Sequence, residues 1–171
     1  TERSLIRNAK QLASTVWADV TSTTIEYYID EQSIKLSDEQ KFAIHNVCTE
    51  SQLAILQGSA GSGKSASMRC VRNIYQSIGK QVIGAAVARS AANNLENEAG
   101  FKSFTIARLL AWLDTDKPPV SQGDVLIIDE AGQVGTFQLE QLMAFATRLN
   151  FKIITFAIIT WFYGLNLVLK M

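Results

Sequence analysis

The chain has 171 residues, of which 47% are hydrophobic, so it can bury the core of one compact domain and is not a disordered chain. Its 16 lysines and arginines balance 16 aspartates and glutamates, which excludes a bulk polycation. Any contact with a nucleic acid must therefore come from a local surface.

Histidine and cysteine chemistry has little support in this chain. His45 is the single histidine, and Cys48 and Cys70 lack the spacing of metal ligands, so neither a zinc site nor histidine-based catalysis is indicated. The polar and charged segment Thr1–Lys10 does not resemble a signal peptide. We therefore expect a cytoplasmic protein whose two thiols are reduced and buried.

Apolar residues recur with helical spacing in some segments and form short continuous runs in others. Helices are expected at residues 4–19, 38–50, 64–78, 90–99, 104–112 and 136–149, and strands at 53–57, 81–86, 125–128 and 152–156. The Thr-, Ile- and Tyr-rich segment 20–29 fits either structure, and the proline-containing segment 114–123 is expected to be a loop. Strands that alternate with helices predict an α/β fold with a parallel sheet and right-handed crossovers.

The run from Gly58 to Ser65 fits the pattern G-x-x-x-x-G-K-[ST] of a phosphate-binding loop. It lies between an expected strand and an expected helix, which is the context that the pattern requires. Small residues let consecutive backbone N–H groups point at phosphate oxygens, and the helix N-terminus adds partial positive charge. We expect Lys64 to reach the β- and γ-phosphates of a nucleotide and the Ser65 hydroxyl to bind Mg²⁺. The alternative is a Gly/Ser-rich turn with an incidental lysine. The expected nucleotide-binding residues of this run are Gly58, Ser59, Ala60, Gly61, Ser62, Gly63, Lys64 and Ser65.

An acidic pair, Asp129 and Glu130, follows the continuous apolar run Val125–Ile128, which is typical of a central parallel strand. Residues at the carboxyl end of such a strand lie at the ligand crevice of the sheet. We expect Asp129 to hold Mg²⁺ through a water beside Ser65, and Glu130 to orient and deprotonate an attacking water. Hydrolysis needs such a base, whereas a kinase would not need one here. The alternative is an Asp-Glu pair that only starts a loop.

Together with Gln40, these two motifs resemble the first motor domain of superfamily 1 DNA helicases on the RecD-like side. The surrounding residues resemble, more specifically, the helicase part of MobF-type conjugative relaxases; the matching stretches are residues 36–40, 55–65, 81–86, 103–107 and 125–135. The resemblance implies a RecA-like P-loop NTPase lobe over residues 36–154, which uses ATP and Mg²⁺ in the cytoplasm of a bacterium. It leaves residues 1–35 as an N-terminal helical extension and residues 155–171 as an apolar tail outside the family pattern.

The resemblance also implies that Gln40 reads the adenine base. A local interpretation exists beside it, because Ser37 and Gln40 have the spacing of a capping box, in which the glutamine reaches back to the start of the helix. The two roles do not exclude each other.

Expected DNA contacts follow the second strand. The family usually carries Ala-Pro-Thr or Ala-Pro-Ser there, but residues 86–88 of this chain have neither the proline nor the hydroxyl. A contact with a DNA phosphate would then pass to Arg89 or Ser90, and plain solvation is the alternative for Arg89. Thr105 matches a family threonine that touches the DNA backbone, and it fits an ordinary helix N-cap equally well.

The family pattern breaks off after Ile154. It would continue into Gly-Asp-x-x-Gln, which senses the γ-phosphate and links ATP to DNA, but this motif is absent. Residues 155–171 are apolar instead, with no charge between Lys152 and Lys170. Three explanations stay open: a frameshift or truncation near Ile154, which we favour, a native pair of extra core strands, or a membrane helix, for which the segment is short and too rich in polar residues.

We therefore expect the ATP-binding and ATP-hydrolysing lobe of a DNA helicase, within a conjugative relaxase that unwinds plasmid DNA for transfer. The resemblance implies single-stranded DNA as a partner, together with a second RecA-like lobe and an upstream relaxase domain that these residues do not include, and no membrane contact. Alone, the chain should bind nucleotide weakly and hydrolyse it slowly or not at all. The alternatives are a RecD-like repair helicase, a non-catalytic remnant that only binds nucleotide and, from another class, a P-loop kinase.

Overall fold

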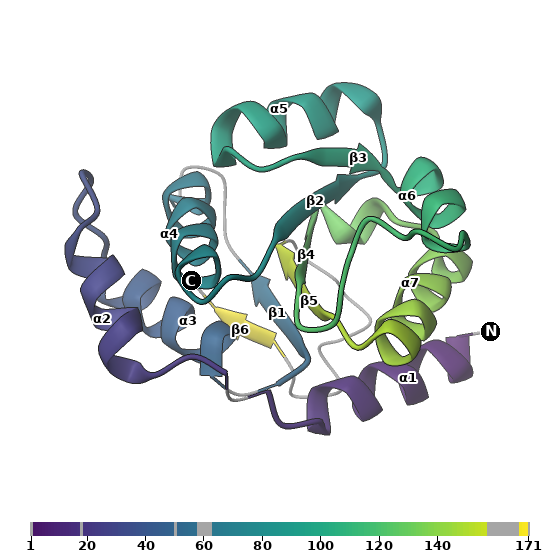
Figure 1. Ribbon diagram of the computed structural model, residues 1–171, viewed down its shortest axis with the longest axis horizontal. Helices are drawn as coiled ribbons and strands as arrows, with labels where there is room; N and C mark the ends of the chain where they lie inside the picture. Colours follow the sequence, from purple (N-terminus) through teal and green to yellow (C-terminus); the bar gives the residue numbers. More distant parts are fainter. Residues whose placement is uncertain (1, 18, 50, 58–62, 157–167, 171) are drawn as a thin grey trace.

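The computed structural model describes residues 2–17, 19–49, 51–57, 63–156 and 168–170 (Figure 1). Its helices are α1 (Glu2–Ser14), α2 (Ser22–Asp30), α3 (Asp38–Thr49), α4 (Lys64–Ser77), α5 (Arg89–Ala99), α6 (Ile106–Leu113) and α7 (Thr136–Leu149), with a short 3₁₀ turn at Ala131–Gln133. Its strands are β1 (Leu53–Gln57), β2 (Val82–Ala86), β3 (Ser103–Thr105), β4 (Val125–Asp129), β5 (Lys152–Phe156) and β6 (Val168–Lys170).

The described strands form one sheet in the order β3-β2-β4-β5-β1-β6, and every neighbouring pair is parallel. β5 lies between β1 and β4 and pairs with both, since Ile153 is opposite Leu53 on one side and Leu126 on the other. The expected parallel α/β sheet is thus confirmed. Because all strands run the same way, the segments that follow β1 and β4 leave the sheet at the same edge, separated only by β5.

Helices cover both faces of this sheet (Figure 1). Alternate residues of one strand enter different cores: Ile127 packs with residues of α2, α3 and α4, whereas Leu126 and Ile128 pack with residues of α1, α6 and α7. Since neither face meets water, every residue of β4 from Val125 to Ile128 is fully buried. This explains why the strand appears in the sequence as an unbroken apolar run.

The segment 20–29, which fitted a helix or a strand, is helical from Ser22 on and forms most of α2. The Thr21 hydroxyl accepts a hydrogen bond from the backbone N–H of Thr24 at 3.3 Å, which caps the helix. Ile25 and Ile29, one turn apart, are then buried on the same side. The cap and the helical spacing of these two isoleucines outweigh the strand preference of the surrounding Thr and Tyr residues.

Two expected helices have different boundaries in the structure. The first ends at Ser14 instead of Asp19, where the hydroxyls of Ser14 and Thr15 both donate to the carbonyl of Gln11 at 2.9 Å and compete with further helical turns. The helix expected at 104–112 begins only at Ile106, because Ser103–Thr105 pair with β2 as strand β3. Helical spacing alone did not reveal this three-residue edge strand.

Both cysteines are free thiols in the core, as expected. Burial raises the pKa of the Cys48 thiol to about 12 and that of the Cys70 thiol to about 12. A thiol reacts and binds metals as its thiolate, so these two side chains stay protonated and inert at neutral pH.

The chain continues the sheet past Ile154, because β5 ends at Phe156 and both Thr155 and Phe156 are buried. Val168–Lys170 forms β6, parallel to β1. The apolar segment 157–167 lies outside the described residues, so the three explanations for it stay predictions. Among the helices that the structure describes, none combines the length and the apolar character of a membrane span.

Candidate active site

The two sequence motifs meet through Lys64 and Asp129. Lys64 is the first residue of α4, after β1, and Asp129 is the last residue of β4, two strands away in the sheet. The Lys64 ammonium donates to Asp129 Oδ1 at 2.6 Å, with 34% of the lysine side chain and 17% of the aspartate side chain exposed. A cation and a carboxylate that are 65 residues apart in the chain therefore share one partly accessible position at the carboxyl edge of the sheet.

The residue before α4 has an uncommon backbone conformation. Gly63, the residue before the helix, has a left-handed backbone with φ 75°, which glycine adopts without strain. Gly63 has no side chain with which to cap the helix, and the first N–H groups of α4 lie at its N-terminal end, where the helix dipole is positive. Residues Gly58–Ser62 of the expected phosphate loop lie outside the described residues.

Gln40 forms the capping box that its spacing with Ser37 predicts. Its Oε1 accepts from the backbone N–H of Ser37 at 2.8 Å, and its own N–H donates to the Ser37 hydroxyl at 3.2 Å. The side chain is 9% exposed and its amide lies against Gly63, where an added Cβ would come within 1.9 Å of Gln40 Nε2. Gln40 thus lies between the start of α3 and Gly63, the residue before α4.

Glu130 is exposed and directly follows the acidic end of β4. Its backbone is left-handed with φ 49°, a conformation that costs a non-glycine residue about 1–2 kcal/mol. Its N–H donates to the Phe156 carbonyl at 2.9 Å and to Asp129 Oδ1 at 3.0 Å, which holds the turn against the end of β5. An exposed carboxylate in a fixed turn is able to accept a proton from a water at this edge of the sheet.

Ser65 is placed beside a residue that the sequence motifs did not indicate. Its hydroxyl donates to Glu98 Oε2 at 2.9 Å, and Glu98 belongs to the last turn of α5. No motif spacing relates these two residues, which are 33 positions apart. Two arginines of α4 bind the same end of α5: Arg69 donates to the Glu98 carbonyl at 2.7 Å, and Arg72 donates to the Ala99 carbonyl at 2.9 Å.

A hollow of about 360 Å³ lies beside α5, β3 and α6, and we call it the α5–α6 groove. Its lining residues are Arg89, Ala92, Asn93, Glu96, Lys102, Ser103, Phe104, Thr105 and Arg108. The structure thus brings Arg89 and Thr105, two of the expected DNA contacts, to one surface. The third, Ser90, is exposed on the first turn of α5 but does not line the groove. The Thr105 hydroxyl also caps α6, accepting from the Arg108 N–H at 3.3 Å.

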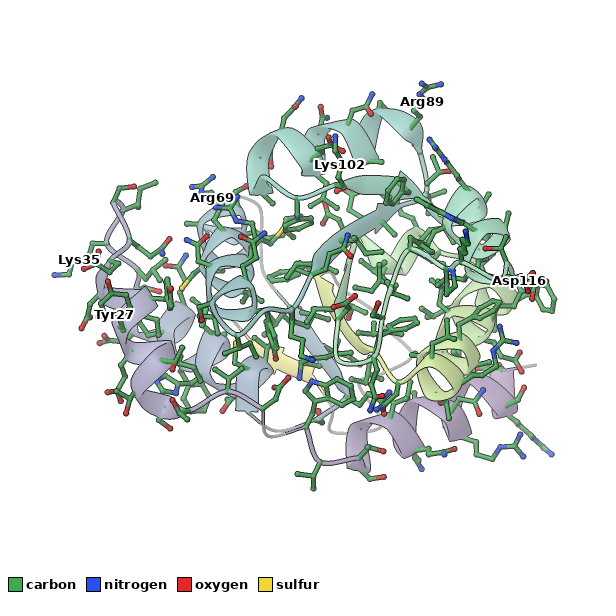
Figure 2. The ribbon with its side chains drawn as sticks, in the orientation of Figure 1. Tyr27, Lys35, Arg69, Arg89, Lys102 and Asp116 are labelled. Carbon is green, nitrogen blue, oxygen red and sulfur yellow. The ribbon has the colours of Figure 1, made fainter. Side chains whose placement is uncertain are left out.

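Sequence reasoning missed two further cations of this groove, Lys102 and Arg108. Figure 2 shows Lys102 between α5 and β3, and Arg89 at the end of α5 away from α4. Lys102 pairs with Glu96 at 2.8 Å, and this hydrogen bond, helped by one from the Ser103 N–H, lowers the pKa of the Glu96 carboxyl. The single carboxylate among the lining residues is therefore ionised and paired, and the two arginines give the groove a positive balance.

Residues 35–157 match the model of a protein family described as an AAA domain. The conjugal transfer protein TraA of Rhizobium radiobacter is 32% identical to this chain over 153 residues, which cover 90% of this chain and 14% of that protein. The probable conjugal transfer protein TraA of Sinorhizobium fredii is 31% identical over 161 residues, with the same shares of the two chains. The chain thus spans 14% of the length of these two curated relatives.

Two helicases are also similar to the chain. The ATP-dependent RecD2 DNA helicase of Deinococcus radiodurans is 28% identical over 113 residues, which cover 64% of this chain and 16% of that protein. The crystal structure of the UvsW helicase from bacteriophage T4 has a TM-score of 0.65 at 9% identity, and the match covers 88% of this chain and 64% of that chain. At this identity the likeness shows the fold alone, and it confirms the expected RecA-like arrangement.

Proposed function

We propose a function from one premise: this chain belongs to the AAA-domain family, whose model it matches over residues 35–157. Its resemblance to the RecD-like helicase part of conjugative relaxases is confirmed by the TraA and RecD2 relatives. The chain is the ATP-binding and ATP-hydrolysing lobe of a DNA helicase, and it acts within a relaxase that unwinds plasmid DNA during conjugative transfer. The observation that carries this proposal is the contact of Lys64 with Asp129 at the carboxyl edge of the sheet.

The residues present fit a magnesium–nucleotide complex. The N-terminus of α4 and the Lys64 ammonium suit phosphate oxygens, and Ser65 and Asp129 offer the oxygen ligands that Mg²⁺ prefers. Within the described part of the chain, no group of three or more His, Cys, Asp or Glu side chains could hold a metal ion by itself. This also fits, because Mg²⁺ commonly takes one or two protein ligands and completes its shell with phosphates and waters.

Each residue of the site then has a separate task. Bound Mg·ATP supplies the phosphoryl group and a cation that neutralises its charge. Lys64 donates to the β- and γ-phosphates, which compete with Asp129 for its ammonium group. Asp129, whose ion pair with Lys64 would then be broken, would hold the hydrated Mg²⁺ together with Ser65. Glu130 orients the attacking water and takes its proton.

Fast ATP hydrolysis requires a second lobe that supplies an arginine to the nucleotide. In related NTPases an arginine supplied from outside the nucleotide lobe accelerates phosphoryl transfer by about 10³- to 10⁵-fold. The chain alone therefore binds nucleotide but turns it over slowly. A second lobe also closes the α5–α6 groove over single-stranded DNA, so that hydrolysis moves the strand.

Two alternatives stand beside this function. The RecD2 relative favours a repair helicase as the second candidate, and the absence of Gly-Asp-x-x-Gln after β5 favours a remnant that only binds nucleotide. DNA-stimulated ATP hydrolysis by the full-length protein supports a helicase, and nucleotide binding without such stimulation indicates the remnant.

Translating the other two frames of the coding DNA downstream of Ile154 decides the origin of the tail. If either frame contains the missing motif, a frameshift is established.

Exchanging Gln40 for glutamate separates its two roles. We expect Gln40→Glu to keep an oxygen acceptor for the Ser37 N–H and hence the stability of the chain, but to lose the amide donor that an adenine requires. The added negative charge lowers the affinity for every nucleotide. The readout is therefore the ratio of ATP to GTP affinity, measured by competition with a fluorescent nucleotide. That ratio should fall toward one.

One outcome gives the opposite answer for Gln40. An unchanged ratio of ATP to GTP affinity assigns it to the capping box alone. The matched variant Gln40→Ala removes both roles and should destabilise the chain by about 0.5–1.5 kcal/mol, because the Ser37 N–H loses its partner.

Replacing the groove arginines is expected to weaken the binding of single-stranded DNA. In Arg89→Ala and Arg108→Ala, each lost phosphate contact should reduce the slope of log affinity against log salt concentration by about 0.7. Anisotropy of a labelled oligothymidylate at several salt concentrations measures both the affinity and this slope. Arg148→Ala is the matched control, because Arg148 stacks on Phe145 of α7 and does not line the groove. An unchanged slope in both groove variants contradicts DNA binding at this surface.

A further inference from the structure

The hydrogen bond from Ser65 to Glu98 gives the proton of the expected metal ligand a defined acceptor. The distance from Ser65 Oγ to Glu98 Oε2 is 2.9 Å. A serine hydroxyl has one proton and two lone pairs, so the direction of the proton determines where the lone pairs point. With its proton directed at α5, the Ser65 oxygen presents its lone pairs away from α5 and is free to bind a cation through them.

Carboxylates commonly orient the residues that bind the metal directly in protein metal sites. They accept a hydrogen bond from a ligand that binds the metal through another lone pair, and removing such an outer partner typically weakens metal affinity by about 10- to 100-fold. Glu98 has this relation to Ser65. It also carries a negative charge on a side chain exposed at the edge of the site.

Glu98 is held in place by contacts that do not use its carboxylate. Arg69 of α4 binds the Glu98 carbonyl and Arg72 binds the Ala99 carbonyl, so the last turn of α5 is fixed to α4 through the backbone. Figure 2 shows Arg69 on α4, with Arg89 at the opposite end of α5. The contact is tight, since a Cβ on Gly100, which ends α5, would come within 2.0 Å of Arg72 Nη1. The Glu98 side chain can therefore be changed without releasing the helix.

We propose that Glu98 is a positioning residue for the magnesium ion of this site, which it serves by accepting the Ser65 proton. This proposal rests on the proposed function, because it assumes that Ser65 binds the metal of a nucleotide complex. Glu98 itself touches neither the metal nor the phosphates. Its effect is therefore specific for the metal-bound nucleotide and is absent when the nucleotide binds without metal.

The test compares nucleotide binding with and without metal. Binding of a fluorescent ATP analogue to the chain is followed by anisotropy, first in EDTA and then during titration with Mg²⁺. We expect Glu98→Ala to raise the half-saturating Mg²⁺ concentration by about 10- to 100-fold and to leave binding in EDTA unchanged or slightly tighter, because a negative charge is removed. Glu98→Gln, which keeps an oxygen acceptor for Ser65, should retain most of the wild-type response to Mg²⁺.

Two controls accompany the variants. Asn97→Ala changes an exposed side chain on the same turn of α5 and should behave as the wild type. Lys64→Ala tests the phosphate site itself: if it too has no effect, the proposed function fails, whereas an effect of Lys64→Ala without one of Glu98→Ala rejects the role of Glu98 alone. Urea unfolding of each variant checks that α5 is still anchored.

Other results overturn the proposal. An unchanged or lower Mg²⁺ requirement in Glu98→Ala shows that Glu98 does not assist Ser65, or that it competes with the metal. An equal loss of affinity in EDTA and in Mg²⁺ shows a general structural effect. Equal losses in Glu98→Ala and Glu98→Gln show that the charge of Glu98, and not the hydrogen bond, attracts the metal.

Discussion

Replacing Lys64 with alanine is expected to lower the affinity for Mg·ATP by about 10- to 100-fold, because a hydrogen bond to a charged group contributes about 1.5–3 kcal/mol. Lys64 pairs with Asp129 at the edge of the sheet where β1 and β4 end, and in the proposed function phosphate oxygens compete with Asp129 for it. Isothermal titration calorimetry with a non-hydrolysable ATP analogue measures the loss. The fold itself should change little, because the pair with Asp129 is partly exposed and such pairs contribute about 0–1 kcal/mol.

Lys35→Ala is the matched control for this experiment. Lys35 is an exposed lysine before α3, at the outer edge of the molecule (Figure 2). The variant loses the same charge as Lys64→Ala but should bind nucleotide as the wild type does. Equal affinity of Lys64→Ala and wild type for Mg·ATP would make the phosphate-loop assignment wrong.

Alanine at Gly84 is expected to destabilise the chain by about 1–3 kcal/mol, the usual effect of overpacking a core. Gly84 lies in the middle of β2, and an added Cβ would come within 2.7 Å of both Leu95 Cδ2 and Phe101 Cε2 and within 2.4 Å of Ser103 Oγ. Leu95 and Phe101 are 3% and 4% exposed, so they have no space into which to move. Urea unfolding followed by circular dichroism measures the loss of free energy.

Gly84→Ala should also weaken the binding of single-stranded DNA. The residues that would have to move include Leu95 of α5 and Ser103 of β3, and both of these elements line the α5–α6 groove. Gly135→Ser is the control: its φ is −61°, nothing lies closer than 3.9 Å to an added Cβ, and a serine at this position can cap α7. This variant should be as stable as the wild type or slightly more stable. A Gly84→Ala chain with wild-type stability would show that α5 packs less closely than the structure indicates.

The candidate site was predictable where its signal is local. The phosphate-loop pattern, the apolar run before Asp129 and the capping-box spacing of Ser37 and Gln40 each lie within a few consecutive residues. Such patterns reflect local physics, namely backbone curvature, two-sided burial of a strand and helix capping. The expectation that the two motifs face one site, with Asp129 beside Ser65, needed one further step, that parallel strands end at one edge of the sheet.

The partners of these residues were not predictable in the same way. Nothing in the sequence around Ser65 indicates that its hydroxyl meets Glu98, and Lys102 and Arg108 carry no motif that assigns them to a groove with Arg89. Strand β3 was hidden for a related reason. Three residues are too few for a periodic pattern, and only the neighbouring β2 gives them hydrogen-bond partners.

By itself, then, the sequence determined the class of fold and the acidic end of β4, and it predicted the phosphate loop, because each leaves a pattern of residue types within a short stretch of the chain. The tertiary structure alone decided that Glu98 of α5 lies beside Ser65 and that residues of α5, β3 and α6 line one groove. Their positions follow from how α5 packs on α4 and β2, through the Arg69 and Arg72 contacts and the close approach at Gly84. Contacts of this kind join residues far apart in the chain, and no local pattern of residue types records them.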